Sequence, residues 1–128
     1  MRFFQKFLVA GCFFPVAFLA TNLPSAHAVS TQPAVLSTIE QVFGEHTWGA
    51  LQVAKCESGL NPSAYNPSGA ATGIFQIVPS TWNGTPFRPY SWEKATDPLI
   101  NIQAAYFIFQ KDGYSWRQWG CKPSSHSG

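Results

Sequence analysis

The sequence has 128 residues, which suits one domain, and only 11% of them are charged. The formal net charge of +2 comes from 8 Lys and Arg against 6 Asp and Glu, and two of the basic residues, Arg2 and Lys6, lie in an apolar N-terminal segment. The rest of the chain is therefore neutral. It lacks the basic stripe that binds phosphates, which excludes nucleic acid as a partner.

The first 28 residues have the pattern of a secretory signal peptide. After the basic start, the apolar stretch "FLVAGCFFPVAFLA" is followed by Ala26-His27-Ala28, a small-x-small cleavage pattern. We therefore predict that residues 1–28 are removed after Ala28 and that the remaining chain is secreted or periplasmic. A short membrane anchor is the alternative. Because the apolar run is shorter than the roughly 20 residues of a spanning helix, we expect no stable membrane insertion.

The three cysteines separate into one near the N-terminus and two in the remaining chain. Cys12 follows Val9-Ala10-Gly11 in a lipobox-like pattern, so a lipoprotein anchored at Cys12 is a minor alternative. Cleavage after Ala28 leaves Cys56 and Cys121, and two thiols in an exported chain most simply form a disulfide. Two free thiols are the alternative. The cysteines and histidines show no metal-ligand spacing, so we expect no metal and no cofactor.

Two helices are predicted after a polar leader at residues 29–34. From Ala34 onward apolar residues recur at intervals of three and four, which predicts an amphipathic helix that ends at Gly44. A second helix is predicted from Thr47, which could cap it, to about Glu57-Ser58. Gly59 and the Asn-Pro pair after it cannot continue that helix.

A loop and a short apolar segment follow the second helix. Residues 58–73 are predicted to be a loop with two Asn-Pro-Ser turns, and residues 74–78 are predicted to be a buried strand or helical turn. A short helix is expected from Pro79. Residues 83–92 form an aromatic-rich loop that contains Phe87, Tyr90 and Trp92.

The last predicted helix is the most strongly marked. Asp97 is its expected N-cap, Pro98 its first residue, and Gly113 its end. Leu99 begins a stripe of apolar residues, and other apolar residues flank it, so this helix is predicted to be central and buried. Two tryptophans then return to the core and residues 122–128 form a polar tail. The fold class is mainly α, a small single domain with one disulfide.

Glu57 differs from the other acidic residues in its predicted surroundings. It ends a helix whose apolar face enters the core, next to Cys56, and it precedes a Gly- and Pro-rich loop that lets a ligand approach. Desolvation disfavours the charged form of a carboxyl, so an acid in this place can donate a proton to a leaving oxygen. A capping or surface role is the alternative. Asp97 is interpreted as a helix cap, and the other acids as surface residues.

The stretch "CESGLNPSAYNPSGAATGIFQIVPSTW" resembles the lytic transglycosylase and lysozyme-like superfamily, including its soluble lytic transglycosylase and resuscitation-promoting-factor types. The resemblance runs from Trp48 to Cys121. It implies that residues 35–121 form a lysozyme-like transglycosylase domain that acts on peptidoglycan glycan strands. The cysteine before the glutamate, with a partner near the end of the domain, is similar to the resuscitation-promoting-factor arrangement.

The resemblance also assigns roles to individual residues. It makes Glu57 the catalytic acid and base, with Ser58 holding the glutamate or the substrate. The residues that it places along the glycan are Tyr65, Asn66, Gln76 and, weakly, Tyr106. Gln76 could instead satisfy buried backbone groups, and Tyr65 could serve packing only. The loop aromatics Phe87, Tyr90 and Trp92 could stack on sugar faces, and packing is the alternative. Many transglycosylases carry a tyrosine seven residues after a helix asparagine; that position here is Ile108, which puts tyrosine support of Glu57 in doubt.

A single candidate acid implies a particular reaction. The usual glycosidase pair needs two carboxyls about 5–9 Å apart, and no convincing second carboxyl is found. We therefore expect a secreted monomer that breaks the β-1,4 bond between MurNAc and GlcNAc with Glu57 alone, forming 1,6-anhydroMurNAc ends. The alternatives are a hydrolytic lysozyme with the same site, a neighbouring enzyme such as a chitinase, and a catalytically weak glycan-binding domain.

Overall fold

This computed structural model describes residues 31–125, which form a mainly helical domain. The predicted signal peptide 1–28, its Cys12 and the end of the polar tail lie outside the described residues. Among residues 31–125, no helix combines the length and the apolar character needed to span a membrane. In chain order the elements are α1 (Thr31–Phe43), η1 (Gly44–His46), α2 (Thr47–Ser58), β1 (Tyr65–Asn66), β2 (Ala71–Thr72), α3 (Pro79–Trp82), η2 (Trp92–Thr96) and α4 (Pro98–Lys111).

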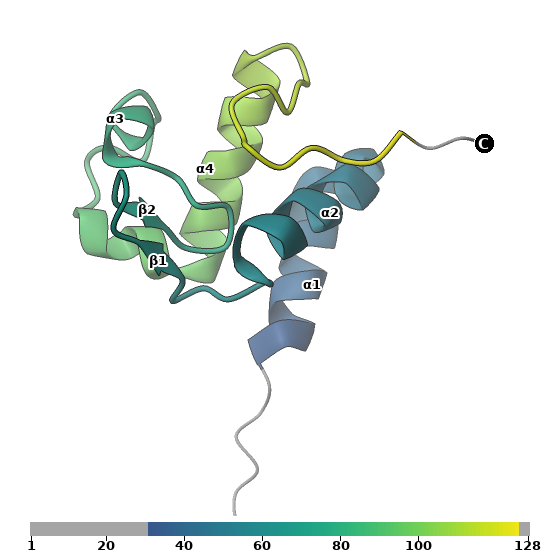
Figure 1. Ribbon diagram of the computed structural model, residues 1–128, viewed down its shortest axis with the longest axis horizontal. Helices are drawn as coiled ribbons and strands as arrows, with labels where there is room; N and C mark the ends of the chain where they lie inside the picture. Colours follow the sequence, from purple (N-terminus) through teal and green to yellow (C-terminus); the bar gives the residue numbers. More distant parts are fainter. Residues whose placement is uncertain (1–30, 126–128) are drawn as a thin grey trace, which may run out of the picture.

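Two groups of elements lie on either side of α4. Figure 1 shows α1 and α2 together on one side and β1, β2 and α3 on the other. Helix α1 contacts both α2 and α4, and η2 contacts α4. The two strands are antiparallel, with Tyr65 opposite Thr72 and Asn66 opposite Ala71. The mainly α, single-domain fold predicted from the sequence is confirmed.

Helix α1 is amphipathic, as predicted, but it begins earlier than its apolar pattern. Val35, Ile39 and Phe43 are buried at intervals of four residues, which places them on one face. The helix begins at Thr31, so residues 31–34, which were predicted as part of the polar leader, are helical. Pro33 is compatible with this start because the N–H groups of a first helical turn have no partner in the helix. Gly44, with φ +53°, follows the last residue of the helix.

Helix α2 ends where the sequence predicts, but its start is capped differently. Gly59 adopts a left-handed conformation, and its N–H bonds back to the carbonyls of Ala54 and Lys55. Thr47 does not cap the helix, because its hydroxyl donates to the carbonyl of Gly44 at 2.6 Å instead of accepting from the helix. The prediction that Thr47 is the cap is therefore wrong, and η1 joins α1 to α2.

Helix α4 begins and ends as predicted, but it is not buried all round. Asp97 accepts from the N–H of Ile100 at 3.1 Å, and Pro98 is the first helical residue. Leu99, which was predicted to begin the buried stripe, is 50% exposed. The core covers the faces that carry Ile102 and Ile108, and Leu99 in the first turn lies outside them.

Asn101 is a fully buried polar residue in the middle of α4. Its Nδ2 donates to the carbonyls of Thr72 and Ala95, at 3.1 and 2.8 Å, and its Oδ1 accepts from the N–H of Phe75 at 2.9 Å. One amide therefore joins α4 to β2, to η2 and to the buried turn after β2. This satisfies polar groups that burial would otherwise penalise.

The C-terminal segment folds back from the end of α4 across α2 (Figure 1). Trp119 is buried, and its Nε1 donates to the carbonyl of Phe75 at 2.9 Å. Cys56 and Cys121 form a disulfide with an S–S distance of 1.99 Å, which confirms the predicted pairing. Beyond it, the backbone N–H and the hydroxyl of Ser124 bond to the side chain of Gln52.

Candidate active site

Glu57 lies in the last turn of α2, where it is half-buried. Its Oε1 accepts a hydrogen bond from the backbone N–H of Cys121 at 3.0 Å. Within residues 31–125, its Oε2 has no protein hydrogen-bond partner. Because the preceding residue, Cys56, is covalently bonded to Cys121, the glutamate is joined to the C-terminal segment both by a hydrogen bond and through the neighbouring disulfide. One carboxyl oxygen is thereby fixed and the other is available to a ligand.

Ser58 fixes the end of α2 to the buried turn beside it. Its Oγ lies 2.8 Å from the carbonyl of Ile74 and 3.2 Å from the carbonyl of Ala54, and both are hydrogen bonds to backbone. Ser58 therefore holds the last turn of the helix in position rather than touching the Glu57 carboxyl.

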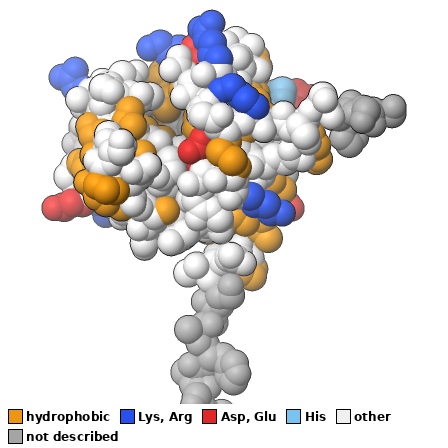
Figure 2. All heavy atoms as spheres, viewed as in Figure 1, with side chains coloured by type: hydrophobic (Ala, Val, Ile, Leu, Met, Phe, Trp, Pro, Cys, Tyr) orange, Lys and Arg blue, Asp and Glu red, His pale blue; other side chains and the backbone are white. Residues whose placement is uncertain are grey.

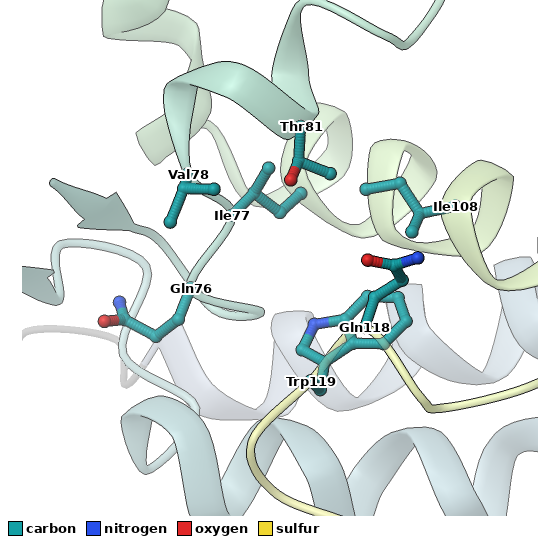
Figure 3. A pocket seen from close by; sticks show the side chains of 7 residues that line it. All are labelled: Gln76, Ile77, Val78, Thr81, Ile108, Gln118 and Trp119. Atoms are coloured by element: carbon teal, nitrogen blue, oxygen red, sulfur yellow. The ribbon is translucent and has the colours of Figure 1, made fainter. Parts of the chain in front are cut away.

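Gln76 braces the loop that carries the two short strands. Its Nε2 donates to the carbonyls of Gly73 and Ala64, at 2.9 and 3.2 Å. This geometry corresponds to the alternative in which the glutamine satisfies backbone groups. Its backbone has φ +49°, a left-handed conformation that costs a non-glycine residue about 1–2 kcal/mol. In Figure 3 its side chain points away from the other labelled residues.

A hollow of about 310 Å³ lies between the segment after β2, α4 and the C-terminal segment. We call it the Gln76 hollow, and its lining residues are Gln76, Ile77, Val78, Thr81, Ile108, Gln118 and Trp119. In Figure 3 the carboxamide of Gln118 points toward Ile108 and Thr81. Glu57 is not among the lining residues. The C-terminal segment connects the two places, because Gln118 and Trp119 line the hollow and Cys121 holds the glutamate.

Gln118 was missed by the sequence analysis. Its only signal is that it lies, together with Arg117, between Trp116 and Trp119. That spacing does not indicate which way the side chain points, because the segment is neither a helix nor a strand.

Tyr65 and Asn66 lie on β1, and both are exposed. Tyr65 is 61% exposed, so its ring is available to a ligand. The side chain of Asn66 accepts from the N–H of Ser68 at 3.0 Å, which stabilises the turn between the strands. Nothing in these contacts assigns either residue to substrate.

The contacts of Tyr106 do not place it beside Glu57. Its ring meets that of Phe43 edge-on, with centroids 5.1 Å apart, and it lines a different hollow together with His46 and Tyr114. Tyr106 and Ile108 are two positions apart on α4, so they lie on nearly opposite faces of the helix. The Gln76 hollow is on the Ile108 face.

The loop aromatics pack around Trp82. Trp92 meets its ring edge-on at 5.5 Å, and Phe87 lies at 6.3 Å, with Tyr90 stacked on Phe87 at 6.3 Å. These contacts correspond to the packing alternative. Tyr90 remains 51% exposed.

The remaining acidic side chains have positions or partners away from Glu57. Asp97 caps α4, Asp112 is paired with Arg117, Glu45 lies 3.7 Å from His46, and Glu40 and Glu93 are exposed. No group of three or more His, Cys, Asp or Glu in the described part of the chain could hold a metal ion.

The fold and the position of Glu57 define a class of protein. A small helical domain of lysozyme-like fold, with a glutamate at a helix end beside a disulfide, is the arrangement that the sequence resemblance implies for lytic transglycosylases. Residues 38–121 match the family described as the Transglycosylase SLT domain. The chain therefore belongs to this family, and the predicted family is confirmed.

One curated relative supports the same assignment. The chain is 36% identical over 70 residues to the protein described as "Probable transglycosylase SceD 2" from Staphylococcus saprophyticus subsp. saprophyticus. The match covers 53% of this chain and 27% of the relative, so the chain spans about a quarter of the relative's length. No solved structure matches the chain significantly.

Proposed function

We propose that this chain cleaves the β-1,4 bond between MurNAc and GlcNAc in peptidoglycan, with Glu57 as its single acid and base. The observation that carries the proposal is the asymmetric environment of the Glu57 carboxyl. Oε1 accepts from the N–H of Cys121, and Oε2 has no partner in the described chain. Membership of the transglycosylase family supports the same role for the glutamate.

The first step is proton transfer to the leaving oxygen. The proton on Oε2 moves to the glycosidic oxygen, and the bond between that oxygen and C1 of MurNAc breaks, which leaves positive charge on the sugar. The N–H of Cys121 then stabilises the carboxylate, because hydrogen bonds to an ionised acceptor are stronger than neutral ones. The substrate's own N-acetyl group supports the developing charge on C1.

The second step returns the enzyme to its starting state. Glu57, now a base, removes the proton from the 6-hydroxyl of MurNAc, and O6 forms a bond to C1. The products are a 1,6-anhydroMurNAc end and a free GlcNAc hydroxyl, and the proton is back on Glu57. If water takes the place of the 6-hydroxyl, the same site gives a reducing end and acts as a lysozyme.

The distribution of the other carboxyls supports a one-acid reaction. Asp97 is used as a helix cap and Asp112 is used in an ion pair, so neither side chain is free to act as a second catalytic group. We also propose that the enzyme works as a monomer outside the cytoplasm, secreted or periplasmic, after cleavage following Ala28. N-terminal sequencing of the exported protein tests that position and separates it from a lipoprotein anchored at Cys12.

Mass spectrometry of the products released from murein sacculi tests the function. Wild-type protein is expected to release muropeptides with 1,6-anhydro ends, and Glu57→Gln is expected to release almost none. The variant should fold normally, because a glutamine side-chain oxygen can still accept from the N–H of Cys121. Reducing ends would indicate a hydrolase with the same site. Protein that pellets with sacculi and releases nothing would indicate a binding domain.

A further inference from the structure

The Gln76 hollow continues into a second hollow at the end of α4. This second hollow has a volume of about 500 Å³, and its lining residues are Ser80, Thr81, Gly84, Phe107, Ile108, Lys111, Asp112 and Gln118. We call it the Lys111 hollow. The two hollows share Thr81, Ile108 and Gln118. Together they form one groove that runs from Gln76 to the last turn of α4.

The far end of this groove carries an excess of positive charge. Arg117 pairs with Asp112 through two hydrogen bonds, at 2.8 and 3.0 Å, so both partners are already neutralised. Lys111 is exposed and forms no hydrogen bond or ion pair within residues 31–125. Its charge acts on Asp112 only as a minor cause of that residue's lowered pKa. Lys111, Arg117 and Asp112 together give this end of the groove a net charge of +1, which suits an anionic ligand.

The surface view agrees with this charge distribution. Figure 2 shows Lys and Arg side chains gathered toward the upper edge of the face, over the end of α4 and the segment after it in Figure 1. Lys111 is three residues after Ile108, so both residues lie on the same face of the helix. A ligand that follows the groove past Ile108 therefore reaches the Lys111 ammonium group.

We propose that the Lys111 hollow binds the stem peptide of peptidoglycan and that Lys111 binds a carboxylate of that peptide. This inference rests on the proposed function. The stem peptide is joined to the lactyl group of MurNAc, so a glycan strand held near Glu57 carries peptides that project beside it. This short peptide of alanine, an acidic residue and a diamino acid has small apolar side chains, amide groups and free carboxylates.

The lining of the groove matches each of these groups. Ile108 and Phe107 offer apolar surface to alanine methyl groups. Thr81, Ser80 and Gln118 offer hydroxyl and amide groups to peptide N–H and C=O groups. Lys111 offers a single ammonium charge to a carboxylate. Arg117 is a poorer candidate for that carboxylate, because Asp112 already occupies its planar fork.

Cleavage of two matched substrates tests the proposal. The substrates are glycan strands that carry uncross-linked stem peptides and the same strands stripped of peptides by an amidase. Wild-type protein is expected to show about a fivefold lower KM on the peptide-bearing strands, the upper end of what an exposed ion pair contributes. Lys111→Gln should remove most of that difference without changing kcat, and it should cut naked strands as wild type does. The difference should shrink at high salt.

Lys94→Gln provides the matched control, because Lys94 is an exposed lysine in η2 outside the groove. This variant is expected to keep the full preference for peptide-bearing strands. NMR on Glu57→Gln protein gives a readout that is independent of catalysis. Muramyl dipeptide should shift the Lys111 and Gln118 signals, whereas N-acetylglucosamine, which has no carboxylate, should leave Lys111 unchanged.

The possible outcomes separate this inference from the proposed function. Equal KM values of wild type on both substrates, with normal cleavage, would overturn peptide binding and leave the function standing. A preference that survives Lys111→Gln would overturn the role of Lys111. Failure to cleave either substrate would reject the function itself, and the NMR titration would then decide the peptide site alone.

Discussion

The backbone N–H of Cys121 donates to Oε1 of Glu57, across a sequence separation of 64 residues. The donor belongs to a residue that is also covalently bonded to Cys56, the neighbour of the glutamate. The disulfide alone would hold the two segments together, but it would not set the orientation of the Glu57 carboxyl. The N–H bond sets that orientation, and the disulfide keeps the N–H in place.

Removing the disulfide should therefore affect catalysis as well as stability. We expect the double variant Cys56→Ser, Cys121→Ser to lose about 4 kcal/mol of unfolding free energy, from the chain entropy of a loop closed over 65 residues. At a temperature where it is folded, its kcat should fall about tenfold or more, since a misplacement of about 1 Å can cost about 100-fold. Its KM should change little. Urea unfolding and steady-state kinetics measure the two effects.

Gln52→Ala is the control for the disulfide variant. It removes a different attachment of the C-terminal segment, the hydrogen bonds from Ser124, and leaves Cys121 in place. Its kcat should equal that of wild type. If the disulfide variant also kept a wild-type kcat, the disulfide would have no positioning role.

Asn101 should be among the most sensitive positions for stability. Asn101→Ala removes three buried hydrogen bonds and leaves groups of Thr72, Phe75 and Ala95 without their partner. Each buried unsatisfied group costs about 1–3 kcal/mol, so we expect a loss of about 3 kcal/mol or more in unfolding free energy. Gln110→Ala, at an exposed position of the same helix, should change it by less than about 0.5 kcal/mol. Urea denaturation measures the unfolding free energy of both variants. Similar losses in the two would contradict the role of Asn101.

The sequence predicts the parts of this site that depend on local patterns. The end of α2 at Glu57-Ser58 follows from Gly59, and the pairing of Cys56 with Cys121 follows from the count of cysteines that remain after the predicted signal peptide. The cap at Asp97 follows from the Asp-Pro pair that begins α4. Each of these predictions needs only neighbouring residues or a residue count.

The rest depends on contacts between distant segments. The donor in the hydrogen bond from Cys121 to Glu57 is a backbone N–H, which nearly every residue carries. The residue types therefore do not indicate this bond. The buried role of Asn101 could be suspected from a polar residue in an apolar helix, but its three backbone partners could not be named. Thr47 is a good capping residue by type, and the η1 turn before it gave its hydroxyl a different partner.

Gly73 should tolerate no side chain. A Cβ at this position would lie 2.4 Å from the carbonyl oxygen of Ala95 and 2.4 Å from Nδ2 of Asn101, and the backbone has φ +81°. Overpacking costs about 1–3 kcal/mol and left-handed strain about 1–2 kcal/mol, so we expect Gly73→Ala to lose about 2–5 kcal/mol of unfolding free energy. Gly44 also has positive φ, but it has open space around it. Gly44→Ala should therefore lose only about 1–2 kcal/mol, which is the cost of the left-handed backbone strain. Equal losses in thermal or urea unfolding would show that the crowding at Gly73 is relieved.

The ion pair at the end of the groove gives a prediction for acid titration. The hydrogen bond from Arg117 lowers the pKa of Asp112 below its ordinary value of 3.8, against a smaller opposing effect of desolvation. A lowered pKa in the folded state means that the pair stabilises the fold at neutral pH, and that this contribution is lost as the pH falls below about 4 through the lowered pKa. Arg117→Gln should raise the pKa of Asp112 and remove this acid sensitivity. Lys111→Gln should raise it less, because the charge of Lys111 is the smallest cause of the shift. Carboxyl carbon NMR titrations of the three proteins measure the midpoints, and a larger shift in Lys111→Gln than in Arg117→Gln would contradict the assigned pairing.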